Sequence, residues 1–141
     1  MIDIHSEQTK LSGCWIQKGF LVITVLFNFC LVAQLLTVGL AVFNDPTWWW
    51  NIHVLLVRGY GGLVVLLLAG LFLHPFPQKI KMLTVGLGIL LTLQFITGHL
   101  NHLLHLRILH PLLGFSLFTS STTLVHRSWH EVFDSSDSVA N

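Results

Sequence analysis

Residues 52–73 read IHVLLVRGYGGLVVLLLAGLFL, an apolar run in which Arg58 is the only charged side chain. A helix of about 20 apolar residues crosses the hydrocarbon core of a membrane, since each residue adds about 1.5 Å. Three other runs have the same character: 20–43, 82–100 and 108–125. The last is the shortest and carries hydroxyl side chains at 119–123, which a helix can bond to its own carbonyls. We therefore predict four membrane-spanning helices.

The composition of the whole chain also indicates a membrane protein. Of its 141 residues, 53% are hydrophobic and 9% are charged, and the mean hydropathy is +0.74. A soluble domain usually carries about 25% charged residues. The net charge of +1 gives no reason to expect a nucleic-acid partner, so the expected environment is the lipid bilayer. Cys14 lies in a polar segment and Cys30 in an apolar run, which does not predict a disulfide framework.

Short connections join the four runs and predict an all-α fold, namely an up-down-up-down four-helix bundle built from two tandem helical hairpins. Asp45-Pro46 separates the first two runs, and Pro75 and Pro77 separate the second from the third, because proline cannot continue a helix. The expected divisions of the chain are an N-terminal tail over 1–18, a four-helix transmembrane domain over 19–126 and a flexible C-terminal tail over 127–141.

The basic residues predict the orientation of the bundle. Most of those near the membrane lie on one side, and Arg107 lies on the other. The positive-inside rule then places both termini in the cytoplasm. We expect a multi-pass protein of a bacterial plasma or thylakoid membrane. The basic residues on the cytoplasmic side are Lys18, Lys79, Lys81 and Arg127.

Two short blocks recur in the same order along the chain. AQLLTVGL (33–40) recurs as LQFITGHL (93–100), with Gln, Thr and Leu in common at an offset of sixty residues. IHVLL (52–56) recurs as LHPLL (109–113), with His in common at an offset of fifty-seven. This pattern predicts a duplicated helical hairpin. The repeated Gln and Thr lie near the middle of the membrane, where we expect interhelical hydrogen bonds.

The duplication pairs His53 with His110. Parallel repeats are related by an axis along the membrane normal, so the two imidazoles should face each other at equal depth. Facing imidazoles of this kind ligate six-coordinate haem iron in helical bundles. Gly114, one turn after His110, leaves room for a flat ring, and Arg58, roughly 7.5 Å deeper than His53 by helical rise, is placed to pair with a haem propionate. We therefore predict a b-type haem near the non-cytoplasmic face, for electron transfer or haem handling with a redox partner.

Two alternatives remain open at this point. Three further histidines precede His110 at spacings of three, which allows copper or zinc binding, although no Cys, Asp or Glu joins them and an interfacial turn explains them as well. The other alternative is a non-catalytic accessory or assembly subunit whose apolar outer faces dock a larger membrane complex. The three histidines are His99, His102 and His105.

Catalysis is poorly supported by the sequence. No carboxylate lies within the apolar runs to orient a histidine, and no nucleophile elbow, phosphate loop or zincin spacing is present. The absence of an intramembrane Asp or Glu also argues against a proton-coupled transporter.

Taken over about residues 20–126, the chain resembles an uncharacterised bacterial family of small four-helix membrane proteins, a domain of unknown function. The resemblance rests on a glutamine, glycine and leucine that end the first helix, a histidine that opens the second with a glycine soon after, and a histidine that opens the fourth. It implies a topology and no activity. The matching residues are Gln34, Gly39, Leu40, His53, Gly59 and His110.

More distantly, the chain resembles one four-helix half of haem A synthase. Each half of that family carries histidines on its second and fourth helices, which are the places of His53 and His110. The first half of that family also has a catalytic glutamate just before its second-helix histidine, where this chain has Trp49, Trp50 and Asn51. The resemblance therefore implies haem binding without the synthase chemistry.

Overall fold

Four helices make up the part of the chain that the structure describes, as predicted. The structure, a computed structural model, describes residues 4–99 and 108–140, with side chains described over 13–98 and 108–133. Over these ranges the fold is all-α, without a strand. The helices are α1 (Ile4–Phe43), α2 (Pro46–Leu73), α3 (Gln78–His99) and α5 (Leu109–Ala140). The outer two therefore extend into the segments predicted as tails.

The connection between α1 and α2 is short because the residues that follow α1 favour the start of a new helix. Asp45 is the N-cap of α2, and its carboxylate accepts from the backbone N–H groups of Thr47 at 2.8 Å and Trp48 at 3.3 Å. Pro46 occupies the first helical position, where its missing N–H costs nothing. Because α2 starts here, the tryptophans 48–50 lie in its first turns. At the other end, His74 closes α2 in an extended conformation.

Three of the helices are long and apolar enough to cross a membrane, which indicates a membrane protein. These spans cover Gly13–Phe43, Pro46–Leu73 and Gln78–Gly98. The fourth helix forms, but by this measure it is not among them, since hydroxyl and histidine side chains lower its hydropathy. The predicted span over 108–125 thus stays a prediction. Its hydroxyls do bond to backbone carbonyls four residues back, as Thr119 and Thr123 illustrate at 3.0 and 2.9 Å.

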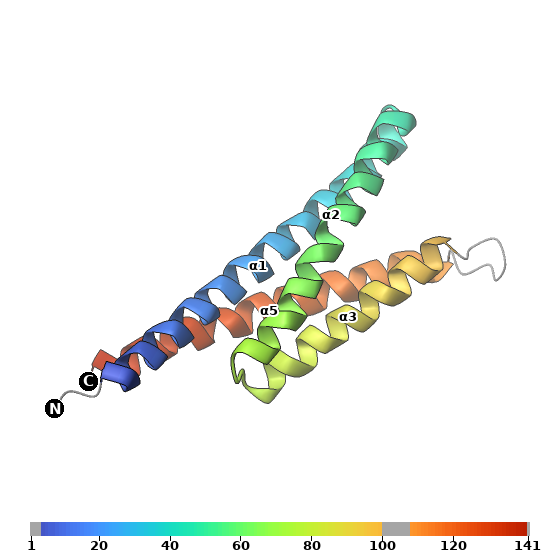
Figure 1. The fold of residues 1–141 in the computed structure, drawn as a ribbon. Helices are drawn as coiled ribbons and strands as arrows, with labels where there is room; N and C mark the ends of the chain where they lie inside the picture. Colours follow the sequence, from blue (N-terminus) through green and yellow to red (C-terminus); the bar gives the residue numbers. More distant parts are fainter. Residues whose placement is uncertain (1–3, 100–107, 141) are drawn as a thin grey trace.

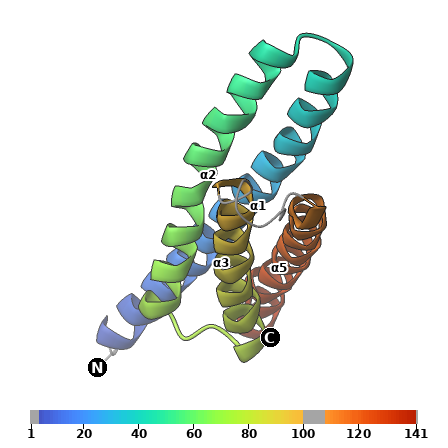
Figure 2. The same cartoon turned by 90° about the vertical axis from the view of Figure 1, so that its right-hand side faces the viewer.

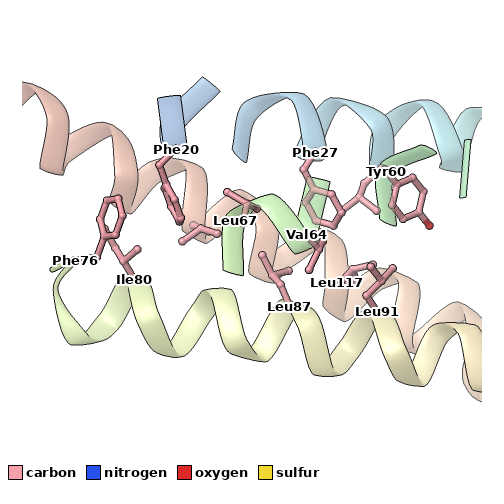
Figure 3. Close-up of a cluster of buried hydrophobic side chains, with 12 residues drawn as sticks. Phe20, Phe27, Tyr60, Val64, Leu67, Phe76, Ile80, Leu87, Leu91 and Leu117 are labelled. Atoms are coloured by element: carbon pink, nitrogen blue, oxygen red, sulfur yellow. The ribbon is translucent and has the colours of Figure 1, made fainter. Parts of the chain in front are cut away.

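The buried core follows the duplication that the sequence predicts. Equivalent positions of α1 and α3 are buried at the offset of sixty, and equivalent positions of α2 and α5 at fifty-seven. These side chains meet along the middle of the bundle (Figure 3). The pairs are Phe20 with Ile80, Thr24 with Thr84, Phe27 with Leu87, Leu31 with Leu91, Tyr60 with Leu117, and Leu67 with Leu124.

The two hairpins lie against each other at one end and diverge at the other. The α1/α2 hairpin and the α3/α5 hairpin meet where α1 begins and α5 ends, and they separate toward the α1–α2 connection (Figures 1 and 2). α1 packs extensively on both α2 and α5, whereas α2 and α3 touch less. We call the diverging end the histidine end, because His53 and His110 belong to it.

Candidate functional site

His53 lies in the second turn of α2 and is 9% exposed. Two side chains of α1 hold its ring. The Nε2 atom of Gln34 lies 2.9 Å from His53 Nε2, and the hydroxyl of Thr37 lies 3.4 Å from His53 Nδ1. We call this set of three residues the first clamp. It joins the end of α1 to the start of α2, so the interhelical hydrogen bonding expected for the glutamine and threonine is present.

The bonding network assigns the proton of the imidazole. Thr37 donates its only hydroxyl hydrogen to the backbone carbonyl of Gln34 at 2.8 Å. Its oxygen must therefore accept from His53, which places a hydrogen on Nδ1. The lone pair of Nε2 is then free to accept from the amide of Gln34. In this hydrogen-bond pattern Nδ1 of His53 carries the hydrogen and Nε2 keeps its lone pair.

The α3/α5 hairpin repeats this arrangement. Gln94 Nε2 lies 3.1 Å from His110 Nε2, and Thr97 Oγ1 lies 3.2 Å from His110 Nδ1. Thr97 donates to the carbonyl of Gln94 at 3.0 Å, so the same proton assignment follows. We call these three residues the second clamp. Each atom-level contact recurs at the offsets of sixty and fifty-seven that the sequence shows.

Each clamp leaves one polar atom without a partner. The side-chain oxygens of Gln34 and Gln94 are buried and accept no hydrogen bond in the structure. Each amide is therefore held through its nitrogen alone, and a buried orphan acceptor has a free-energy cost. Another hydrogen-bond donor could bond to these oxygens and so reorient the glutamine side chains.

Small and aromatic residues shape the surroundings of the two rings. Trp50 stacks on His53 with ring centroids 5.0 Å apart and planes at 11°. A Cβ placed at Gly98 would lie 3.7 Å from Cε1 of His110, and one placed at Gly114 would lie 3.3 Å from Nε2 of Gln94. The space at Gly114, which the sequence assigned to a flat ring, thus borders the glutamine of the second clamp.

The two clamps belong to different hairpins, the first to α1 and α2 and the second to α3 and α5. Arg58 does not join them, because its side chain is exposed. Five helical residues rotate a side chain by about 140° relative to His53, which carries the guanidinium to the outer side of α2. The expected contact of Arg58 with a haem propionate stays a prediction.

The predicted copper or zinc cluster falls mostly outside the described residues. His102 and His105 lie beyond them, as does the side chain of His99, which ends α3. Among the side chains that the structure does describe, no group of three His, Cys, Asp or Glu residues is arranged to hold a metal ion.

The sequence analysis did not predict a further contact between a glutamine and a histidine. Gln17 on α1 lies 3.1 Å, Nε2 to Nε2, from His74 at the end of α2. A Cβ at Gly13 would lie 3.6 Å from the same imidazole. Gln17 and Gln34 both lie on α1, and each contacts a histidine on the other side of the α1–α2 connection. A search for glutamines and histidines at similar sequence distances before and after this connection would therefore find both pairs.

The comparison with protein families gives one match. Residues 34–98 match the model of a family of unknown function, DUF6220. The matched segment starts at the glutamine of the first clamp and ends one residue after Thr97, short of His110. This supports the expected uncharacterised domain, whereas the likeness to haem A synthase stays a prediction. No curated protein and no solved structure matches the chain.

Proposed function

We propose that this protein holds one b-type haem between His53 and His110 and serves electron transfer or haem handling in a membrane. The observation that supports the proposal is the repetition of one histidine environment on alternate helices. The bond that each threonine makes to a backbone carbonyl assigns the ring hydrogen to Nδ1, which leaves Nε2 with a lone pair. A pair of such imidazoles is the ligand set of a six-coordinate haem iron.

The donor chemistry of the clamps fits this group. A histidine that binds a metal usually donates its second ring N–H to an oxygen, which fixes the tautomer and the orientation of the ring. Thr37 and Thr97 supply that oxygen, and each is itself oriented by a backbone carbonyl. The amides of Gln34 and Gln94 occupy the Nε2 positions and would give way to iron. Their unpaired oxygens mean that no second hydrogen bond opposes this rotation.

The residues of the site would have the following roles in binding the haem. His53 and His110 would ligate the iron, and the two threonines would hold the rings in place. Apolar side chains of the core keep water away from the middle of the bundle. A haem bound there would supply a one-electron redox centre. No carboxylate of the spans is available for acid–base chemistry, so an enzymatic role is not proposed.

The absorption spectrum of the detergent-solubilised protein from haem-replete cells tests the proposal. We expect a Soret band and a reduced-minus-oxidised α band, both lost in His53→Ala and in His110→Ala. The matched control is His126→Ala, because His126 is an exposed histidine of α5 outside both clamps. Far-UV circular dichroism shows whether each variant keeps its helices. A colourless preparation, or bands that survive replacement of both clamp histidines, would refute the proposal.

A further inference from the structure

The outward face of α2 carries a charged residue and small residues among its leucines. The buried residues of α2, among them His53 and Leu67, mark the side that packs on the bundle. At about 100° per residue, Arg58, Gly62 and Ala69 lie within about 30° of the opposite direction. All three are exposed, and so is Asn51 on the same line. Two exposed leucines, Leu55 and Leu73, lie at the same angular distance from this direction as Arg58.

This composition is unusual for a surface that faces lipid. Helices in membranes approach one another through small and polar residues, whereas lipid chains are matched by large apolar ones. A Cβ at Gly59 or at Gly62 would meet no atom within 4 Å. The fold of this chain therefore does not need glycine at either position. A helix approaching from outside would use the space that these two residues leave.

Arg58 gives this face a charge that the chain itself does not neutralise. It forms no ion pair with any side chain over 13–98 and 108–133. Guanidinium groups stay protonated in proteins, and charged side chains within a membrane generally pair with a partner. Between Gly19 and Val125 the only carboxylate is that of Asp45, which caps α2. A second copy of this chain would bring another arginine and no free carboxylate.

We propose that the outward face of α2, centred on Arg58 and Gly62, docks a transmembrane helix of a different protein that carries a carboxylate at the depth of Arg58. The favoured occupant is a helix because Arg58 lies eight residues beyond Trp50, which is about 12 Å farther into the span. A lipid phosphate at the surface would need neither that depth nor the adjacent glycines. This proposal is independent of haem binding.

The test uses the purified full-length protein in zwitterionic lipid vesicles at pH 8. The probe is a synthetic leucine-alanine transmembrane peptide that carries one glutamate at the matching depth, and its control has glutamine there. Energy transfer between dyes on the protein and on the peptide measures association. We expect the glutamate peptide to associate about tenfold more tightly than the glutamine peptide. Arg58→Leu should remove this preference, and Arg58→Lys should keep it.

Two further variants complete the test. Gly62→Leu should weaken both peptides equally, because it blocks the approach without changing charge. Arg127→Leu is the matched charge control and should leave the preference intact. Equal association of both peptides with the unaltered protein would overturn the proposal. A parallel assay in vesicles that contain phosphatidylglycerol measures lipid binding, and a result in which Arg58→Leu changes only that binding would also overturn the proposal, since the face would then bind a lipid headgroup.

Discussion

A double-mutant cycle across the first clamp tests the geometry on which the site depends. The perturbations are Gln34→Leu, His53→Leu and the pair together. Gln34→Leu removes the 2.9 Å bond, leaves the acceptor of His53 unpaired and at the same time removes the orphan oxygen of the glutamine. The last two effects are of similar size, about 1–3 kcal/mol each, and oppose each other. The net effect is then the loss of the hydrogen bond between Gln34 and His53.

The coupling energy follows from this balance. Hydrogen bonds between helices in a membrane contribute about 0.6 kcal/mol on average and about 1.7 kcal/mol at most. We expect the cycle for Gln34 and His53 to give a coupling within that range. The second clamp, Gln94 with His110, should give a similar value, since its corresponding distance is 3.1 Å.

Equilibrium unfolding in mixed micelles, titrated with dodecyl sulfate and followed by far-UV circular dichroism, supplies the four free energies of each cycle. The control cycle pairs Gln34 with His74, which lies at the opposite end of α2 and bonds to Gln17 instead. Distant sites without a shared partner add within about 0.5 kcal/mol. The reasoning fails if the clamp pair couples no more strongly than this control pair.

Four further substitutions have definite expected outcomes. Thr97→Val removes the acceptor for the Nδ1 hydrogen of the second clamp, and a titration should show haem affinity reduced about 10–100-fold. Gly70→Ala should be less stable than Gly62→Ala by about 1–3 kcal/mol in the unfolding assay, because both gain helix propensity but only the Cβ at Gly70 would lie 3.1 Å from Cδ2 of Phe20. Asp45→Ala removes the N-cap of α2 and should cost about 1 kcal/mol in the same assay, and an unchanged free energy would contradict the capping role.

The helices were predictable because hydropathy and proline both act locally. Asp45 and Pro46 determine the start of α2 by themselves, through a cap and a fixed backbone angle. The ends of the outer helices were less predictable. α1 extends back to Ile4 and α5 on to Ala140, although polar composition marked both segments as tails. Hydropathy reports where the membrane ends, and a helix can continue beyond it.

The candidate site was predictable in part. The repeat identified Gln34, Thr37 and His53 and their counterparts, because equal residues at a constant offset need only the sequence. It did not show that these residues bond to each other within one hairpin. That depends on the relative rotation of two packed helices, which a repeat does not determine. Arg58 illustrates the same limit. Helical rise gives its depth relative to His53, but the side of α2 on which its side chain lies depends on how α2 is rotated in the bundle.

The location of the clamps bears on how the bundle is held together. Both clamps tie helices within a hairpin, α1 to α2 and α3 to α5, and they do so at the end where the hairpins diverge (Figure 1). The buried core, by contrast, joins the hairpins to each other along the middle of the bundle. The polar bonds at the histidine end therefore stabilise each repeat. The contact between repeats rests on apolar packing and on the bond that Thr122 of α5 donates to Asn28 of α1 at 3.2 Å. A metal ligated by one imidazole from each hairpin would be a polar link between them at the histidine end, which the hydrogen bonds of the clamps do not provide.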